Sequence, residues 1–250
     1  MIKLSRPDCP EELEKLKDEL TQEYKDTKKT VWKRKFITVP LLKMSNDKCA
    51  FCECKLGEEG KYMQVEHFHH KNEYKDEVVD WNNLLPICIR CNSHKLDHDT
   101  YLLPIIDPTQ IDPKNHLEFY KYRMLGKDDI GNLTVEVLDL NNTTEIATPR
   151  FQIGNAVLEK LEDVLEVVQN FDVDSKDATE KARVIRKVRA LLKKSTSVNI
   201  YCATVATVLL TAPDYLLLKL EMEKKALWTV ELQKIEDSVA NIALDQRERF

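Results

Sequence analysis

Glycine is scarce in this sequence, with 5 among 250 residues, and internal repeats and low-complexity stretches are absent. Hydrophobic residues make up 42% of the chain and charged residues 32%, which are ordinary proportions for a folded protein. This composition argues against a disordered chain. It favours a helix-rich protein with one large domain or two modest ones.

No apolar run in the sequence is long enough for a membrane span. The most apolar stretch, residues 198–212, is interrupted by threonines and is shorter than the roughly 18 residues that a transmembrane helix needs. The first ten residues, MIKLSRPDCP, lack the apolar core of a signal peptide. We therefore expect a cytoplasmic protein without membrane contact. In a reducing cytoplasm, paired cysteines indicate a metal site rather than disulfides.

The chain also has no excess of positive charge, since its formal net charge is -5. A phosphate backbone responds to local basic clusters, however, so this balance does not exclude nucleic-acid binding. Two such clusters are present. Each is either a solvated helix face or a phosphate contact, with partner docking as a further alternative for the second. The first contains Lys28, Lys29, Lys33, Arg34 and Lys35, and the second Lys181, Arg183, Arg186, Lys187, Arg189, Lys193 and Lys194.

Apolar residues recur at helical spacing near the start of the chain. We predict an N-terminal helical segment over residues 1–45, in which Leu13, Leu16, Leu20 and Tyr24 share one buried face. The helix is expected to continue toward Phe36 and to carry the first basic cluster on its outer side.

The middle and the C-terminal parts of the chain differ in pattern. Residues 46–150 contain the paired cysteines, followed by an alternating stretch, Leu133–Leu138, that predicts a strand paired in a hairpin with Phe119–Met124. Residues 151–250 keep helical spacing, and we expect a long last helix from Asp214. The sequence thus predicts a mostly helical α+β fold with a helical C-terminal region.

Two C-x-x-C pairs lie in the middle region, Cys49 with Cys52 and Cys88 with Cys91. Structural zinc prefers four tetrahedral Cys or His ligands, and two such pairs supply them while joining distant segments of chain. We therefore predict a structural Zn²⁺ site formed by these four cysteines, although Cys49 with Cys54 would also make a permissible pair. The cysteines that we expect to be spare are Cys9, Cys54 and Cys202.

The segment between and after the cysteine pairs combines an acid, a histidine and asparagines. It contains Glu66-His67, then Asn83-Leu84, and after the second pair Asn92-x-x-Lys95. This order resembles the HNH, or ββα-metal, nuclease motif, in which two antiparallel strands and a helix surround one divalent ion. The resemblance implies a zinc-stapled ββα-metal module and phosphodiester hydrolysis, which needs an activated water and a cation on the phosphate.

The resemblance also implies a role for each motif residue. His67 matches the general base, and Glu66 matches the acidic ligand of a catalytic Mg²⁺ or Mn²⁺. Asn83 matches the asparagine that fixes the loop bearing the base, Asn92 matches a second ligand of that ion, and Lys95 matches a substrate-binding residue that contacts phosphate. Glu66 stands where Asp is commoner, and Asn92 stands where histidine gives the motif its name, but both keep a donor atom.

The other histidines have competing interpretations. His69 and His70 are either substrate contacts or exposed loop residues, and we retain His70 as a candidate substrate-binding residue. His94 and His98 are four residues apart, so on a helix they would share a face and form a rival metal-binding pair. His116 has no such context, and we expect a structural or surface role for it.

A wider resemblance surrounds the motif, over roughly residues 1–150. The matching blocks are similar to the PtuB-like nuclease subunits of Septu and retron-linked antiphage defence systems. This resemblance implies an ABC/SMC-like ATPase partner in a hetero-oligomer. The blocks are Ile2-Lys3-Leu4-x-Arg6-Pro7, Glu66-His67-Phe68-x-x-Lys71, Asp80-Trp81-x-Asn83-Leu84, Cys88-x-x-Cys91-Asn92-x-x-Lys95, Ile106-Asp107-Pro108 and Leu138-Asp139-Leu140-Asn141.

Two functions therefore compete. The first is a metal-dependent HNH endonuclease that cleaves DNA, or RNA, as the effector subunit of a defence complex. The alternative is a zinc-stabilised nucleic-acid-binding or assembly module without catalysis, which the acidic net charge and the imperfect motif favour.

Overall fold

The computed structural model describes residues 1–58, 62–173 and 178–247, and the chain divides into two compact units. Unit 1 consists of Met1–His116 and Gly126–Leu140, and unit 2 of Leu117–Leu125 and Asn141–Phe250. Helices and short strands occur in both units. The expectation of a mostly helical α+β protein is thereby confirmed.

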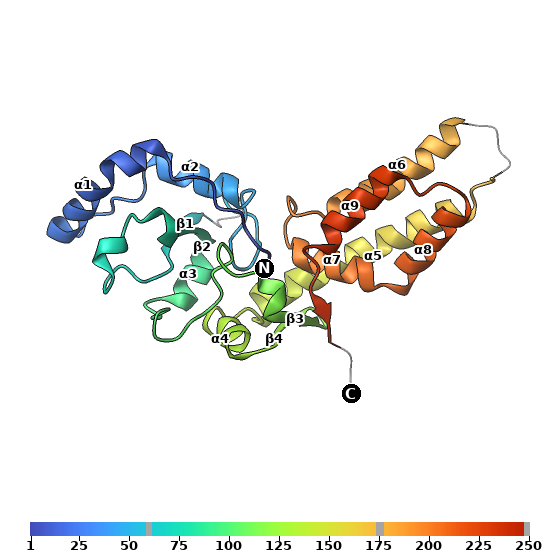
Figure 1. Cartoon of the computed structure of the whole chain (residues 1–250). Helices are drawn as coiled ribbons and strands as arrows, with labels where there is room; N and C mark the ends of the chain where they lie inside the picture. Colours follow the sequence, from blue (N-terminus) through green and yellow to red (C-terminus); the bar gives the residue numbers. More distant parts are fainter. Residues whose placement is uncertain (59–61, 174–177, 248–250) are drawn as a thin grey trace. The chain divides into compact units, whose positions relative to one another are not determined.

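Unit 1 contains a two-stranded antiparallel sheet, formed by β1 (Met63–His67) and β2 (Leu84–Cys88). Helix α3 packs against both strands, and α2 packs against β2 (Figure 1). The remaining elements are α1 (Glu11–Thr27), α2 (Lys35–Met44), α3 (Ile89–Lys95), α4 (Asp129–Val137) and the 3₁₀ turns Lys75–Glu77, Trp81–Asn83 and Pro113–Asn115.

The N-terminal segment contains two helices, so the expectation of one helix continuing toward Phe36 is wrong. Helix α1 buries Leu13, Leu20 and Tyr24, as its spacing predicts, and Leu16 on the same face is half-buried. It ends at Thr27 because Lys28 adopts a left-handed conformation with φ of 57°. The first basic cluster consequently lies in the connection between α1 and α2 and at the start of α2.

An extended arm before α1 is fastened to the start of β2. The Arg6 guanidinium donates hydrogen bonds to the carbonyl oxygens of Trp81, at 2.6 Å, and Leu84, at 2.9 Å. It also lies 5.6 Å from the centre of the Trp81 ring. The indole nitrogen of Trp81 in turn donates to the carbonyl of Pro7 at 2.8 Å. These contacts fix the chain just before the strand that leads to the second cysteine pair.

The stretch Leu133–Leu138 is mainly helical, so the strand predicted there is wrong. Helix α4 begins after Asp128, whose carboxylate accepts a hydrogen bond from the Gly131 amide at 2.8 Å. The carbonyl oxygen of His116 lies 2.0 Å from the position that a Cβ on Gly131 would occupy, so only glycine fits there. A short alternation of apolar and polar residues fits a helix as well as a strand, and the cap decides between them.

A hairpin does form, but from residues nearer the N-terminus. Its strands are β3 (Leu117–Tyr120) and β4 (Arg123–Gly126). Lys121 and Tyr122, which connect them, have φ of 46° and 64°, as a tight two-residue hairpin turn requires. The predicted first strand, Phe119–Met124, therefore contains the turn of the actual hairpin.

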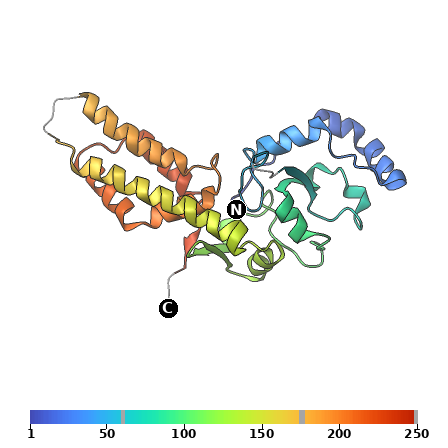
Figure 2. The same ribbon diagram turned by 180° about the vertical axis from the view of Figure 1, so that it is seen from behind.

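The helices of unit 2 enclose an apolar core. Helix α5 packs against α6, α7 and α8, and Figure 2 shows α5 and α6 lying beside each other. The core includes Leu161 of α5, Leu192 of α6 and Leu218 of α8, each with 0% exposure. The elements of unit 2 other than the hairpin are a π-helical turn (Thr143–Ala147), α5 (Thr148–Gln169), α6 (Ala178–Lys194), α7 (Cys202–Thr211), α8 (Pro213–Lys224), α9 (Val230–Ala240) and β5 (Asp245–Gln246), which pairs in parallel with β3.

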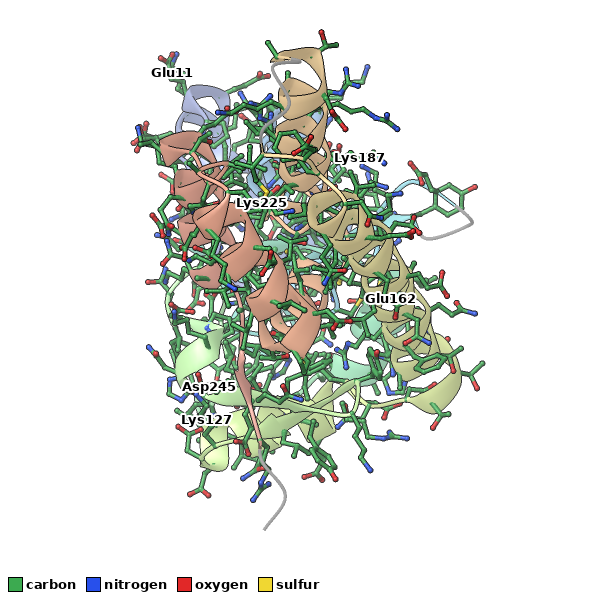
Figure 3. The ribbon with its side chains drawn as sticks, turned by 90° about the vertical axis from the view of Figure 1, so that its right-hand side faces the viewer. Glu11, Lys127, Glu162, Lys187, Lys225 and Asp245 are labelled. Atoms are coloured by element: carbon green, nitrogen blue, oxygen red, sulfur yellow. The ribbon has the colours of Figure 1, made fainter. Side chains whose placement is uncertain are left out.

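The expected long last helix is divided into α8 and α9, so that expectation is wrong. Ala226 takes a φ of 52° between them, and the hydroxyl of Thr229 accepts a hydrogen bond from the Leu232 amide to start α9. Lys225, labelled in Figure 3 with Glu162 of α5 and Lys187 of α6, donates to three carbonyl oxygens at the end of α5. The break therefore places a cation at the C-terminus of α5, where carbonyls lack helical partners.

Within the described residues, no single helix is both long enough and apolar enough to cross a bilayer. Only the consecutive pair α7 and α8 meets the length and composition requirement together, and these two helices are bent by 68°.

Candidate metal and catalytic site

The predicted motif residues lie on a strand–strand–helix unit. In the sheet, Glu66 is opposite Leu85 and His67 is opposite Leu84, and β2 leads directly into α3 at Cys88. The loop between the strands carries His69 and His70. The end of β1 and one face of α3 are thereby brought together.

The four predicted cysteines form one buried cluster. The Sγ atoms of Cys49, Cys52, Cys88 and Cys91 all lie within 4.8 Å of one another, and those of Cys52 and Cys88 are 3.7 Å apart. A tetrahedral ion with Zn–S bonds of about 2.3 Å requires sulfur atoms about 3.8 Å apart. The cluster is therefore suited to a metal such as zinc, and the ligand set is the one predicted from the spacing.

The three other cysteines lie outside this group among the described residues. Cys54 is buried beside it, and its carbonyl oxygen accepts a hydrogen bond from the Cys49 amide at 2.9 Å. This bond closes the tight turn that presents the first cysteine pair. Cys9 is half-buried, and Cys202 is buried in α7 of unit 2.

A pocket of about 280 Å³ opens at the end of β1. Its lining includes Glu66, His67, His70 and Asn92, so four of the predicted site residues face the same space. Lys95 and Asn83 are not among the residues that line it. The remaining lining residues are Thr30, Trp32, Lys33, Gln64, Val65, Lys71, Leu96 and Asp97.

His67 is buried, and its ring is held in one orientation. Its Nε2 lies 2.9 Å from the carbonyl oxygen of Val78. Because a carbonyl only accepts, Nε2 carries the proton and Nδ1 keeps a lone pair. The edge of the Trp32 ring packs against the imidazole, with centroids 4.5 Å apart. Burial and the charge of Lys71 lower the pKa of His67 to about 3, so the ring is neutral at pH 7.

Glu66 forms a buried ion pair with Lys95. The distance from Lys95 Nζ to Glu66 Oε1 is 2.6 Å, and the Lys95 side chain is 0% exposed. Burial raises the pKa of Glu66, while the ammonium of Lys95 opposes that shift. The charge of Lys95 is thus paired inside the unit, and its phosphate contact stays a prediction.

Asn83 is buried and fastens the loop that follows β1. Its side-chain oxygen accepts a hydrogen bond from the His69 amide at 2.7 Å, and its Nδ2 donates to the carbonyls of His69, at 3.0 Å, and Glu77, at 3.1 Å. Since Val78 follows Glu77, these bonds also hold the carbonyl that orients His67.

The donor set of the pocket is compatible with a hard divalent ion. Glu66 offers a carboxylate and Asn92 an amide oxygen, and both side chains line the pocket. Mg²⁺ is commonly bound through one or two such oxygen ligands, and it takes its remaining ligands from water and phosphate. Glu66 and Asn92 therefore fit an ion of this class.

His69 and His70 have different surroundings. His69 stacks on Tyr101 with ring centroids 3.7 Å apart, and its Nδ1 lies 2.7 Å from the hydroxyl of Thr100. His70 lines the pocket, and its Nδ1 is 4.0 Å from Asp97. His70 therefore faces the pocket, and its substrate contact stays a prediction, whereas His69 belongs to an aromatic cluster.

His94 and His98 do not share a helix face, so the expectation of a rival pair on one helix is wrong. Helix α3 ends at Lys95, and Leu96 has a φ of 47°. His98 consequently turns to the carbonyl of Leu103, with Nε2 and the oxygen 2.7 Å apart, while His94 lies 3.9 Å from Asp139. His116 contacts Asp128 at 2.5 Å, which is a structural contact.

The two basic clusters have different positions. Lys33 of the first cluster lines the pocket at β1. In the second, Arg183, Arg186 and Arg189 line a separate hollow of about 540 Å³ in unit 2, where Arg189 pairs with Glu231 at 2.6 Å. A phosphate contact by these arginines stays a prediction.

A comparison with curated proteins shows a relative along almost the whole chain. The chain is 42% identical over 236 residues to the Septu protein PtuB of Bacillus thuringiensis, an alignment that covers 94% of this chain and 92% of the relative. The chain belongs to the PtuB family of Septu proteins. A Septu protein PtuB of Bacillus mycoides (strain KBAB4) is 32% identical over 111 residues, covering 32% of this chain and 37% of that protein. No family model and no solved structure matches the chain.

Several residues of this PtuB family member have roles that sequence reasoning missed. Arg6 and Trp81 belong to the sequence blocks that resemble PtuB-like subunits. In the structure they join the N-terminal arm to β2. Arg90 of α3 donates to the carbonyls of Leu138 and Asp139, which gives the block at residues 138–141 a structural role. Trp32 and Lys71 line the pocket, and no motif spacing links them. Of these two residues, only Lys71 could have been found from the sequence, because it is the last residue of the block that contains His67.

Proposed function

We propose that this PtuB family member is a metal-dependent HNH endonuclease that hydrolyses phosphodiester bonds of DNA, or of RNA. The observation that carries the proposal is the pocket in which Glu66, His67 and Asn92 meet. They lie on a β-β-α unit whose helix begins with two cysteines of the cluster. A ββα-metal module with a structural zinc site is the interpretation of this unit that explains both groups of residues.

His67 acts as the general base in the proposed reaction. Its Nδ1 takes a proton from a water while the oxygen of that water forms a bond to phosphorus. The bond between phosphorus and the 3′-oxygen of the leaving strand breaks, and that oxygen acquires a proton from solvent. The products then carry a 5′-phosphate and a 3′-hydroxyl, as the HNH resemblance implies.

Glu66 and Asn92 would hold the catalytic Mg²⁺ or Mn²⁺. Lys95 is paired with Oε1 of Glu66, so Oε2 is the carboxylate oxygen proposed for the ion. When bound, such an ion neutralises charge on the phosphate and on the leaving oxygen. Asn83 has a positioning role. It holds the loop whose Val78 carbonyl orients the His67 ring.

We further propose that the chain is the effector subunit of an antiphage defence complex, held by an ABC/SMC-like ATPase. Membership of the Septu PtuB family supports this assignment. The ATPase would restrain the nuclease until infection, which makes a hetero-oligomer the working form.

The test is cleavage of plasmid DNA by the full chain, alone and together with the proposed ATPase partner, in the presence of Mg²⁺ or Mn²⁺. We expect cleavage that requires the ion and is lost in His67→Ala. Equal cleavage by a His67→Ala protein that keeps its metal and fold would contradict the assignment of the base.

One observation favours the alternative of a non-catalytic module. The ammonium of Lys95 neutralises Glu66, the only acid proposed as a ligand of the catalytic ion. If neither the chain nor its complex cuts DNA or RNA with either ion, while the chain still binds nucleic acid, the binding-module function replaces the nuclease.

A further inference from the structure

The pocket at β1 is lined by lysine side chains other than Lys95, which is the lysine that the motif indicates. A nucleic-acid phosphodiester carries a negative charge and needs a positive partner when it enters a pocket. Lys95 is not available for this purpose because it is buried and paired with Glu66. The lysines that line the pocket are Lys33 and Lys71.

Lys71 is held close to the general base by an aromatic side chain. Its Nζ lies 5.7 Å from the centre of the Trp32 ring, within the range of a cation–π contact. The edge of the same indole packs against His67, with centroids 4.5 Å apart. The hydroxyl of Tyr24 donates to the Lys71 carbonyl at 3.4 Å, which also fastens the backbone. One indole therefore sets the positions of both the ammonium and the imidazole.

The charges around the pocket leave a positive balance. Three ammonium groups, of Lys33, Lys71 and Lys95, are set against two carboxylates, of Glu66 and Asp97. Within residues 1–58, 62–173 and 178–247, Lys71 makes its contact with the Trp32 ring and no ion pair. Among these residues no carboxylate makes a direct contact with the half-buried Lys71 ammonium, so this group can pair with an incoming anion. The anion that fits beside a general base of this kind is a phosphate group.

We propose that Lys71, with Lys33 as a second contact, binds the phosphodiester group of a nucleic-acid strand in this pocket, and that Trp32 positions Lys71. The inference rests on the proposed function, since it names the substrate contact of the same site. It assigns to Lys71 the phosphate contact that the motif assigns to Lys95.

The test measures binding separately from cleavage. The full chain carrying His67→Ala is titrated with a fluorescein-labelled DNA duplex, and anisotropy is recorded at several KCl concentrations. Lys71→Gln should weaken binding about tenfold at low salt and should lower the slope of log K against log salt by about 1, the loss of one phosphate contact. Lys71→Arg keeps the charge and should retain the slope. Lys33→Gln should have a smaller effect of the same kind.

The matched control is Lys15→Gln. Lys15 lies on α1, its side chain is 75% exposed and it does not line the pocket. Lys15→Gln removes the same charge as Lys71→Gln, but at a position outside the pocket. The slope of log K against log salt should therefore equal that of the His67→Ala parent. An unchanged slope in Lys71→Gln would overturn the inference, as would a chain that binds no DNA.

Cleavage by the chain with His67 intact distinguishes the two proposals. If Lys71→Gln lowers the binding slope but the chain never cuts, Lys71 is a strand contact and the nuclease proposal fails. If the chain cuts and Lys71→Gln cuts with the same KM and kcat, the nuclease proposal stands and the assignment of Lys71 fails.

Discussion

Unit 1 buries polar and charged side chains beside its pocket, whereas unit 2 buries a continuous cluster of aliphatic ones. Glu66, His67, Asn83 and Lys95 are each no more than 5% exposed in unit 1. In unit 2, the apolar faces of α5, α6 and α8 meet in one core. Fold and candidate site therefore depend on the same residues in unit 1, while unit 2 gains stability from side chains without a proposed chemical role.

The sheet of unit 1 is too small to fold by itself. It has two strands of five residues each, and isolated two-stranded sheets are marginally stable in water. The cysteine cluster joins the turn before β1 to the end of β2 and the start of α3. Unit 1 is therefore expected to depend on a bound metal, and unit 2 on apolar packing.

The largest expected effect follows from Cys52→Ser. Loss of a thiolate should release the metal and unfold unit 1, because structural zinc sites contribute on the order of 10 kcal/mol to folding. The helices of unit 2 should stay protected from hydrogen exchange. Metal content by mass spectrometry and exchange rates for each unit provide the measurement. Cys9→Ser, outside the cluster, should keep the metal, and an unaltered metal content in Cys52→Ser would refute the site.

The converse change is Leu161→Ala in unit 2. Leu161 is 0% exposed in the core, so the cavity should lower the free energy of unfolding by about 2–5 kcal/mol. The metal content of unit 1 should not change. Urea unfolding combined with metal analysis checks both statements, with Glu162→Ala at the neighbouring exposed position as control. Loss of metal in Leu161→Ala would show that the units do not fold independently.

Asn83→Ala should affect stability and activity together. It removes three hydrogen bonds to the loop after β1 and takes the side-chain partner from the partly buried amide and carbonyl of His69, at a cost of about 1–3 kcal/mol. Because the loop carries the Val78 carbonyl, cleavage should fall by more than the loss of folded protein explains. The measurement compares kcat with the folded fraction at the same temperature. A fall in proportion to the folded fraction alone would leave Asn83 with no positioning role.

The smallest effect concerns Asp80, which joins α1 to the start of β2. Burial by itself would raise the pKa of Asp80, but hydrogen bonds from the Lys17 ammonium, at 2.6 Å, and the Asn82 amide outweigh it and lower the pKa. A lowered carboxyl pKa stabilises the fold above the unfolded value of about 3.9, and this stabilisation is lost as the pH falls through the folded value.

The melting temperature of the wild type should therefore exceed that of Asp80→Asn at neutral pH, and the difference should shrink below a pH of about 4. A difference that does not change between pH 7 and pH 3 would mean that the Lys17 contact does not depend on charge.

Sequence reasoning succeeded where a single period or spacing decides the outcome. The cysteine spacing predicted the four members of the cluster, and helical spacing predicted the buried face of α1. It failed at the boundaries of elements, where left-handed residues such as Lys28 and Ala226 end a helix that the apolar pattern continues. Residues 133–137 are likewise helical rather than extended, because the Asp128 cap and Gly131 start helix α4 just before them.

The candidate site was predicted in part for a related reason. Glu66, His67 and Asn92 carry chemistry at recognisable spacing, and they line the same pocket. The pairing of Lys95 with Glu66 and the contacts of Trp32 depend on which segments pack together, and no local pattern encodes that. Lys95 illustrates the limit, because the same lysine suits a phosphate contact or a buried ion pair, and only burial distinguishes them.

The central claim is that His67 is the base of an ion-dependent nuclease. Its most direct test is cleavage of plasmid DNA by the metal-loaded chain, with the proposed ATPase partner, in the presence and absence of Mg²⁺. The account predicts nicked or linear product with the ion, none without it, and none from a His67→Ala chain that retains its metal and helical content. Cleavage by His67→Ala at the wild-type rate would contradict it.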